Sequence, residues 1–121
     1  QDQKKDHVAI DRIDETAYEI IYLKTNSVVS SYHVLLKKDV TNQDSVKVFI
    51  KKFRNELCVN ECNVSIYDSK EVVHLINKYP LEGEDYISFA EHLVSFSSFD
   101  APDAFNWYPY KNEQYYKFKQ K

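Results

Sequence analysis

The fold is decided by one stretch of the sequence, Thr41-Asn-Gln-Asp-Ser-Val-Lys-Val-Phe-Ile-Lys-Lys-Phe-Arg-Asn-Glu-Leu57. Thr41 is placed to cap a helix, and Asp44 adds a carboxylate where the helix dipole favours negative charge. Apolar residues then recur at the spacing that places side chains on one helical face: Val46, Phe49, Ile50, Phe53 and Leu57. We therefore predict an amphipathic helix that packs its apolar stripe on a sheet.

Strands are predicted on both sides of this helix. Val28–Lys37 and Cys62–Tyr67 each alternate between two faces, as half-buried strands do. A strand, a helix and a strand in about forty residues have the length of a right-handed parallel crossover. Ala17–Leu23 has isoleucines at helical spacing, but its β-branched and aromatic residues favour a strand. We expect it to form a hairpin with Val28–Lys37 through the turn at Thr25-Asn26-Ser27.

A second helix and a further strand are predicted after residue 67. Asp68-Ser-Lys-Glu71 resembles a capping box, and Tyr79-Pro80 ends the helix that it begins. Tyr86–Phe99 is predicted to be one long strand, and the aromatic segment Phe105–Tyr110 closes the domain.

These elements predict one α+β domain, which suits a chain of 121 residues. It has a small mixed sheet of about four strands that contains a β-α-β unit, with two helices packed on the sheet. Residues 1–6 are expected to form a flexible N-terminal segment, and residues 7–121 the single domain.

Composition excludes several classes of function. Gly83 is the one glycine, whereas phosphate loops, dinucleotide fingerprints and the G-x-S-x-G elbow need several. The net charge of -3 argues against nucleic acid as a partner. No apolar run approaches the ~20 residues of a membrane span, so a soluble domain is expected. Basic residues gather on the polar side of the central helix, and we interpret them as a solvated face: Lys47, Lys51, Lys52 and Arg54.

Cys58 and Cys62 have a spacing that brings their Cα atoms about 6 Å apart on a helical turn, within disulfide reach. We predict a structural disulfide that ties the helix end to the next strand, with two free thiols as the alternative. No second Cys/His pair with ligand spacing lies nearby, so no metal site and no cofactor are expected. A cysteine nucleophile paired with a histidine is incompatible with the disulfide.

Two groups of residues are candidates for a functional site. His33 and His92 lie on predicted strands, and either is a candidate acid/base or metal ligand if the fold brings carboxylates near: Glu91, Asp100 or Asp103. Phe105–Tyr110 contains four aromatic residues, which suit either core packing or a binding surface. The binding residues predicted from this segment and its surroundings are Trp107, Tyr108, Tyr110 and His92.

From Ser31 to Tyr110 the chain resembles small uncharacterised exported or lipoprotein-like bacterial domains. The resemblance rests on Cys62-Asn-Val-Ser-Ile-Tyr-Asp68, Tyr79-Pro-Leu-Glu-Gly83, Phe99-Asp-Ala-Pro-Asp103 and Tyr108-Pro-Tyr110. It implies an exported location, periplasmic or attached to the cell surface, and no particular activity.

The sequence thus predicts a non-enzymatic exported domain that binds a protein or another extracytoplasmic ligand, through a sheet edge or the Trp107–Tyr110 region. The alternatives are a small hydrolase-like or metal-assisted enzyme that uses His33 or His92, and a structural accessory domain. Methionine is absent, so we expect that Gln1 follows a removed leader, with a lipid anchor upstream as one form of attachment, or that the chain is cut from a larger protein.

Overall fold

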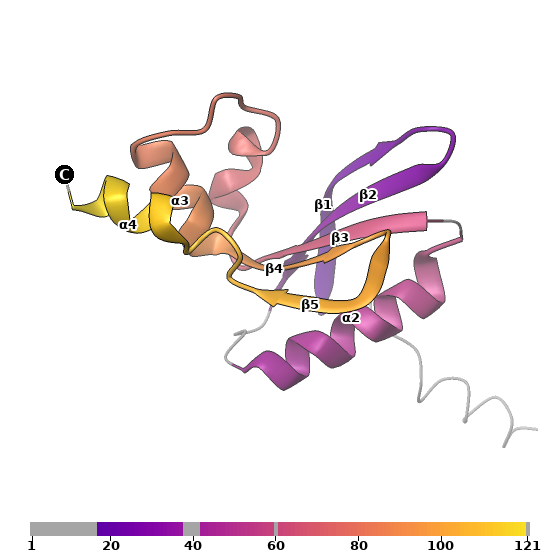
Figure 1. Cartoon of the computed structure of the whole chain (residues 1–121). Coiled ribbons are helices and arrows are strands. Elements are labelled where there is room, and N and C mark those ends of the chain that lie inside the picture. Colours follow the sequence, from indigo (N-terminus) through magenta and orange to yellow (C-terminus); the bar gives the residue numbers. More distant parts are fainter. Residues whose placement is uncertain (1–16, 38–41, 60, 121) are drawn as a thin grey trace, which may run out of the picture.

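The computed structural model describes residues 17–37, 42–59 and 61–120, which form a mixed α+β fold with one five-stranded sheet (Figure 1). The strands follow one another in the sheet in chain order, from β1 to β5. Strands β2 and β3 are parallel, and the other neighbours are antiparallel. The elements are β1 (Tyr18–Thr25), β2 (Val29–Leu36), α2 (Gln43–Leu57), β3 (Glu61–Tyr67), the 3₁₀ helix η1 (Lys70–Leu75), α3 (Glu84–His92), β4 (Leu93–Ser98), β5 (Ala101–Trp107) and α4 (Glu113–Lys119).

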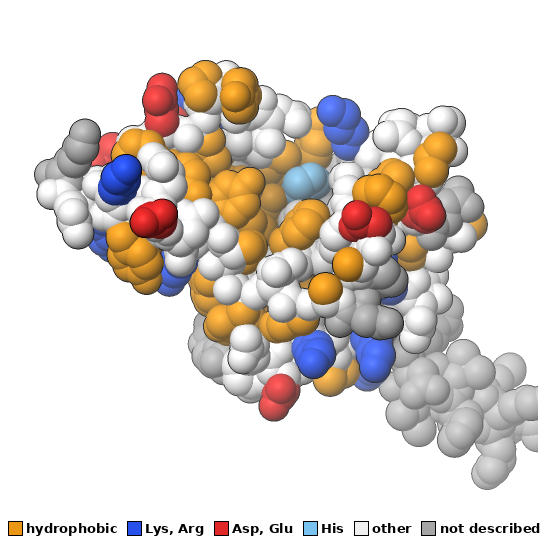
Figure 2. Space-filling view, in the orientation of Figure 1, with side chains coloured by type: hydrophobic (Ala, Val, Ile, Leu, Met, Phe, Trp, Pro, Cys, Tyr) orange, Lys and Arg blue, Asp and Glu red, His pale blue; other side chains and the backbone are white. Residues whose placement is uncertain are grey.

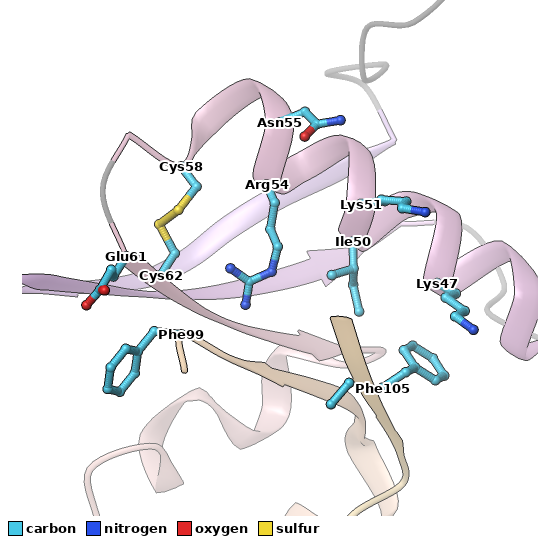
Figure 3. Close-up of a pocket in the computed structure, with 11 residues that line it drawn as sticks. Lys47, Ile50, Lys51, Arg54, Asn55, Cys58, Glu61, Cys62, Phe99 and Phe105 are labelled. Atoms are coloured by element: carbon cyan, nitrogen blue, oxygen red, sulfur yellow. A yellow bond between two sulfur atoms is a disulfide. The ribbon is translucent and has the colours of Figure 1, made fainter. Parts of the chain in front are cut away.

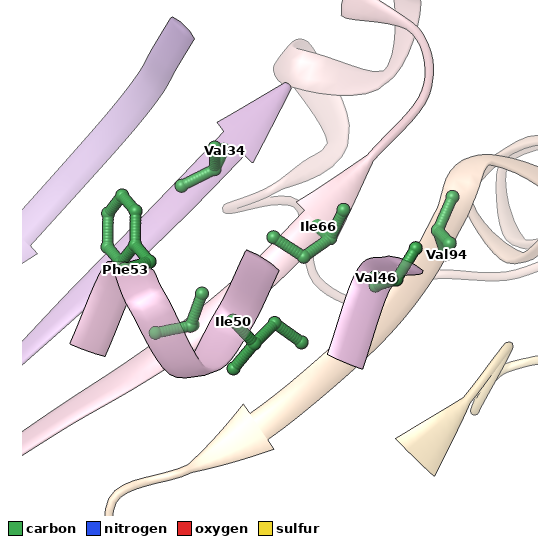
Figure 4. Packing of buried hydrophobic residues seen from close by; sticks show 7 residues of the cluster. Val34, Val46, Ile50, Phe53, Ile66 and Val94 are labelled. Atoms are coloured by element: carbon green, nitrogen blue, oxygen red, sulfur yellow. The ribbon is translucent and has the colours of Figure 1, made fainter. Parts of the chain in front are cut away.

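Helix α2 packs its apolar stripe on one face of the sheet, as predicted (Figure 4). Phe53 and Val46 are almost fully buried there, against Val34, Ile66 and Val94 from three different strands. The predicted cap, Thr41, lies outside the described residues. The side chain of Asn42 accepts a hydrogen bond from the Ser45 N–H and so caps the helix.

The two strands before α2 form the predicted hairpin. The side chain of Asn26 accepts hydrogen bonds from the backbone N–H groups of Val28 and Val29, which stabilises the tight turn. Because β2 and β3 are parallel neighbours, α2 is the crossover of a β-α-β unit, and this part of the prediction is confirmed.

The helices η1, α3 and α4 gather at one end of the sheet, and we call them the helical layer (Figure 1). Tyr67 and Leu93 from the strands are buried there with Leu75 of η1 and Phe89 of α3. The start predicted for the second helix is confirmed, since the Ser69 side chain accepts a hydrogen bond from the Glu71 N–H. The element itself is a short 3₁₀ helix.

The prediction of one long strand over Tyr86–Phe99 is wrong. This segment is helical to His92 and becomes strand β4 at Leu93. Tyr86, Phe89 and Ala90 are the buried residues of α3, and their spacing is that of one helical face. The sheet has five strands because the closing segment also contributes β5, and the described residues contain four helices rather than two. The last of them, α4, packs against α3.

A disulfide joins Cys58 and Cys62 across 6.0 Å between their Cα atoms, which confirms the predicted bridge. It connects the residue after α2 to β3 within the crossover. Among the helices of the described residues, none combines the length and the apolar character needed to cross a membrane.

Candidate functional site

A groove of about 770 Å³ lies between α2 and the corner where β3 begins and β4 turns into β5 (Figure 3). We call it the α2–β5 groove. One wall is the polar side of α2, and the opposite side comes from the β4–β5 hairpin. Its lining residues are Lys47, Ile50, Lys51, Arg54, Asn55, Cys58, Glu61, Cys62, Phe99, Ala104 and Phe105.

Three basic residues on successive turns of α2 line this groove. Lys47 and Lys51 are exposed, and within the described part of the chain neither forms an ion pair. Arg54 is half-buried and donates from Nε and Nη2 to Ser97 Oγ, at 3.2 and 2.8 Å. Its Nη2 also donates to the carbonyl oxygens of Ser97 and Ser98, at 3.1 and 2.9 Å. The interpretation of this side as a merely solvated face is therefore wrong for Arg54, which joins α2 to β4.

Apart from Asn55 and Glu61, the rest of the lining consists of aromatic and aliphatic side chains and the two disulfide-bonded cysteines. Phe99 is 38% exposed at the β4–β5 turn, and Phe105 is half-buried on β5. The Phe105 ring stacks on Trp107, with 6.0 Å between the ring centroids. The disulfide closes one end of the groove, as Figure 3 shows. The groove thus offers cations beside apolar surface on a rigid support.

The aromatic residues predicted to bind a partner are divided between two parts of the fold. Trp107 and Tyr108 pack against the core between α2 and the sheet, with 5.0 Å between their ring centroids. Tyr110 instead lies against α3, 5.2 Å from the Phe89 ring and 5.6 Å from the Tyr86 ring. A binding role for these residues stays a prediction.

His92 has a carboxylate partner, although not one that the sequence indicated. Its Nδ1 lies 2.6 Å from Asp68 Oδ1, and both side chains are about one-third exposed. Burial, and to a lesser extent the charge of Asp68, raise the pKa of the Tyr108 hydroxyl nearby. Glu91 accepts hydrogen bonds from Lys119 and the Tyr115 hydroxyl, which lower the pKa of its carboxyl group.

His33 lies on the sheet face opposite α2, in an aromatic setting. Its Nδ1 is 2.8 Å from the Tyr67 hydroxyl, and its ring contacts Tyr22 edge to face. Figure 2 shows hydrophobic side chains gathered between the helical layer and the strands, with a histidine among them. His33 and His92 thus have different partners, so the structure does not bring them together as one acid/base pair. Within the described residues no group of three or more His, Cys, Asp or Glu side chains is arranged to hold a metal ion.

Burial lowers the pKa of His33 to about 4 from its ordinary value of 6.5. The unfolded chain therefore binds a proton that the folded chain does not between these two pH values, and stability falls as pH drops from 6.5 to 4. Each pKa unit corresponds to about 1.4 kcal/mol, and solvent screening of the half-buried ring reduces the total to about 1–2 kcal/mol. Urea unfolding at pH 7.5 and pH 4.5 should show this loss in the wild type and less of it in His33→Gln. An equal pH dependence in both proteins contradicts the assignment.

Comparisons of the chain with protein-family models, curated proteins and solved structures found no match. The function is therefore argued from the site.

Of the residues in the groove, the sequence indicated the two cysteines, the basic side of α2, interpreted as a solvated face, and Phe105 as part of the aromatic segment. Phe99, Ala104 and Phe105 enter the lining only because the β4–β5 hairpin returns beside α2. The clustering of lysines every four residues was the one available signal of this site.

Proposed function

We propose that this chain is a non-enzymatic binding domain whose α2–β5 groove takes an acidic segment of a protein partner. The observation that carries the proposal is the pair Lys47 and Lys51, exposed on the groove wall beside the rings of Phe99 and Phe105. A groove with exposed cations next to apolar surface suits a ligand that presents carboxylates and aliphatic side chains together.

The net charge of -3 does not oppose this ligand at short range. Exposed charges are screened beyond about 8–10 Å at ordinary ionic strength, so the local charges of the groove dominate once a segment has docked. Among the described residues of the lining, Glu61 is the single acidic one. Lys and Arg side chains gather over α2 next to β5 in the space-filling view (Figure 2).

The lining favours binding over catalysis. Among the described residues that line it there is no histidine, and its two cysteines are joined in the disulfide, so the side chain most often used as a general base and a free thiol nucleophile are both missing from this lining. The best support for an enzyme is the contact between His92 and Asp68, which orients one imidazole. This makes the small hydrolase-like enzyme the second candidate, with a structural accessory domain as the third.

We also propose an exported location, periplasmic or at the cell surface. Disulfides persist in oxidising compartments and are rare in the cytosol, and the Cys58–Cys62 bridge is compatible with the former.

Trp107 provides the test of the groove, because it is the one tryptophan of the chain and stacks on Phe105 in the lining. We expect a peptide of about seven residues, in which glutamate alternates with valine, to change Trp107 fluorescence saturably. The double variant Lys47→Glu/Lys51→Glu should weaken binding at least about tenfold, and added salt should weaken binding to the wild type.

The matched control is Lys24→Glu/Lys117→Glu, which makes the same change in net charge on β1 and α4, away from the groove. It should bind the peptide within about threefold of the wild type. If both double variants weaken binding equally, the peptide responds to net charge alone, and binding in the groove is refuted. The absence of any peptide binding refutes it as well.

A further inference from the structure

We propose that the acidic segment binds as an added β-strand on the outer edge of β5, with alternate side chains directed at Lys47 and Lys51. This inference rests on the proposed function and specifies the conformation and chemistry of the partner. It describes the ligand as an extended peptide with carboxylates at every second position.

Strand β5 is the last strand of the sheet and pairs with β4 alone among the described residues. Trp107 lies opposite Ser95, while the next N–H, that of Tyr108, donates to the Val94 carbonyl at 2.8 Å. This pattern identifies Trp107 and Ser95 as a pair that is not hydrogen-bonded to each other. The N–H and C=O groups of Trp107 therefore point to the outer edge. The register of the β4–β5 pair shifts beyond Asn106, so the regular edge lies around Trp107. Such an edge is a template for another extended chain.

The opposite edge of the sheet, β1, is a poorer template. Two of its side chains contact η1 and the loop that follows η1. Lys70 of η1 lies 3.1 Å from Glu19, and the Asn77 side chain donates to the Tyr22 hydroxyl at 2.7 Å. The groove and its lysines lie beside β5 instead.

Spacing supports an extended occupant with alternating carboxylates. In a strand, residues two apart on one face are separated by about 6.5–7 Å. Lys47 and Lys51 are one helical turn apart, which separates their Cβ atoms by about 5–6 Å. Flexible lysine side chains span the remaining difference. A peptide that pairs with β5 therefore presents successive same-face carboxylates at nearly the separation of the two ammonium groups.

Phe105 and Trp107 provide an apolar surface for the uncharged atoms of the ligand. Both rings face the α2 side of the sheet, where they pack on the core. An added strand would place its acidic side chains beside these two rings, while its other side chains point to the opposite face of the sheet. The methylene groups of glutamate can cover the rings and leave the carboxylate at the lysines.

The test uses the same glutamate/valine peptide and two backbone-methylated forms of it, with the wild-type protein and Trp107 fluorescence as the readout. One form carries three N-methyl groups on its glutamates and the other three on its valines, so the two forms have equal charge and equal composition. In an added strand the N–H groups of alternate residues point toward β5. We expect one methylated form to bind within about threefold of the parent and the other to bind at least about tenfold more weakly.

The possible outcomes separate the two proposals. If both methylated forms bind like the parent, the groove binds acidic peptides without strand pairing, and this inference falls while the proposed function stands. If both are weakened equally, the alternation that defines an added strand is absent, and the inference falls as well. If the parent peptide itself does not bind, both proposals fall. In the supporting case, amide exchange at Trp107 slows on binding by at least about tenfold.

Discussion

Replacing Phe53 with alanine should destabilise the domain by about 3–5 kcal/mol. The Phe53 side chain is 0% exposed, and its ring is the centre of an aromatic group that joins α2 to the hairpin. The ring centroids of Tyr32, Tyr18 and Phe49 lie 5.2, 5.8 and 5.8 Å from it. Truncation removes these contacts and leaves a cavity that the surrounding strands cannot close. Because a domain of this size has a total stability of about 5–15 kcal/mol, a large share of it would be lost.

Urea unfolding followed by circular dichroism measures this change. Val48→Ala is the matched control, because Val48 lies on the same helix and is 53% exposed. It should change the free energy of unfolding by less than about 0.5 kcal/mol. A loss below about 1.5 kcal/mol in Phe53→Ala would show that α2 is not anchored by this ring.

The sequence predicted α2, the parallel crossover and the disulfide because each depends on residues close together in the chain. Phe53 and Leu57 lie on one helical face, whatever the rest of the fold does. Cys58 and Cys62 are likewise only four residues apart in the chain, and their Cα atoms lie 6.0 Å apart. Local patterns of this kind determine local geometry, and tertiary packing then stabilises it.

Helix α3 was missed because its apolar residues satisfy two periods at once. Ile87, Phe89 and Leu93 fit alternation, whereas Tyr86, Phe89 and Ala90 fit a helical face. Short apolar segments cannot be assigned by period alone. The better signal lay just before them, where Gly83 caps the helix and two acidic residues occupy its first turn.

The site was less predictable than the fold because its parts come from distant segments. Asp68 was assigned to the start of a helix, and its contact with His92 arises only where the end of β3 meets the end of α3. The groove depends on the return of the β4–β5 hairpin beside α2. Residue spacing does not encode contacts between distant segments. The sequence therefore indicated the lysines of α2 and the aromatic segment that begins at Phe105, but not that the two lie side by side.

Arg54 should be the second residue whose loss strongly affects stability. Its guanidinium group donates to Ser97 Oγ and to the carbonyl oxygens of Ser97 and Ser98, and Ser97 is only 1% exposed. Arg54→Ala leaves the acceptors of buried Ser97 and half-buried Ser98 without the charged donor, at a cost of about 1–3 kcal/mol for each buried group left unsatisfied. We expect the free energy of unfolding to fall by about 2–4 kcal/mol in total.

Arg54→Lys distinguishes the geometry of the guanidinium group from its charge. A lysine keeps the positive charge but lacks the planar fork that reaches a hydroxyl and two carbonyl oxygens at once, so it should restore only part of the stability. Lys51→Ala, one turn away on the exposed side, should change stability by less than about 0.5 kcal/mol. If Arg54→Ala proved as mild as Lys51→Ala, the bond between α2 and β4 would contribute little, and the groove would lack the rigid wall that both binding proposals require.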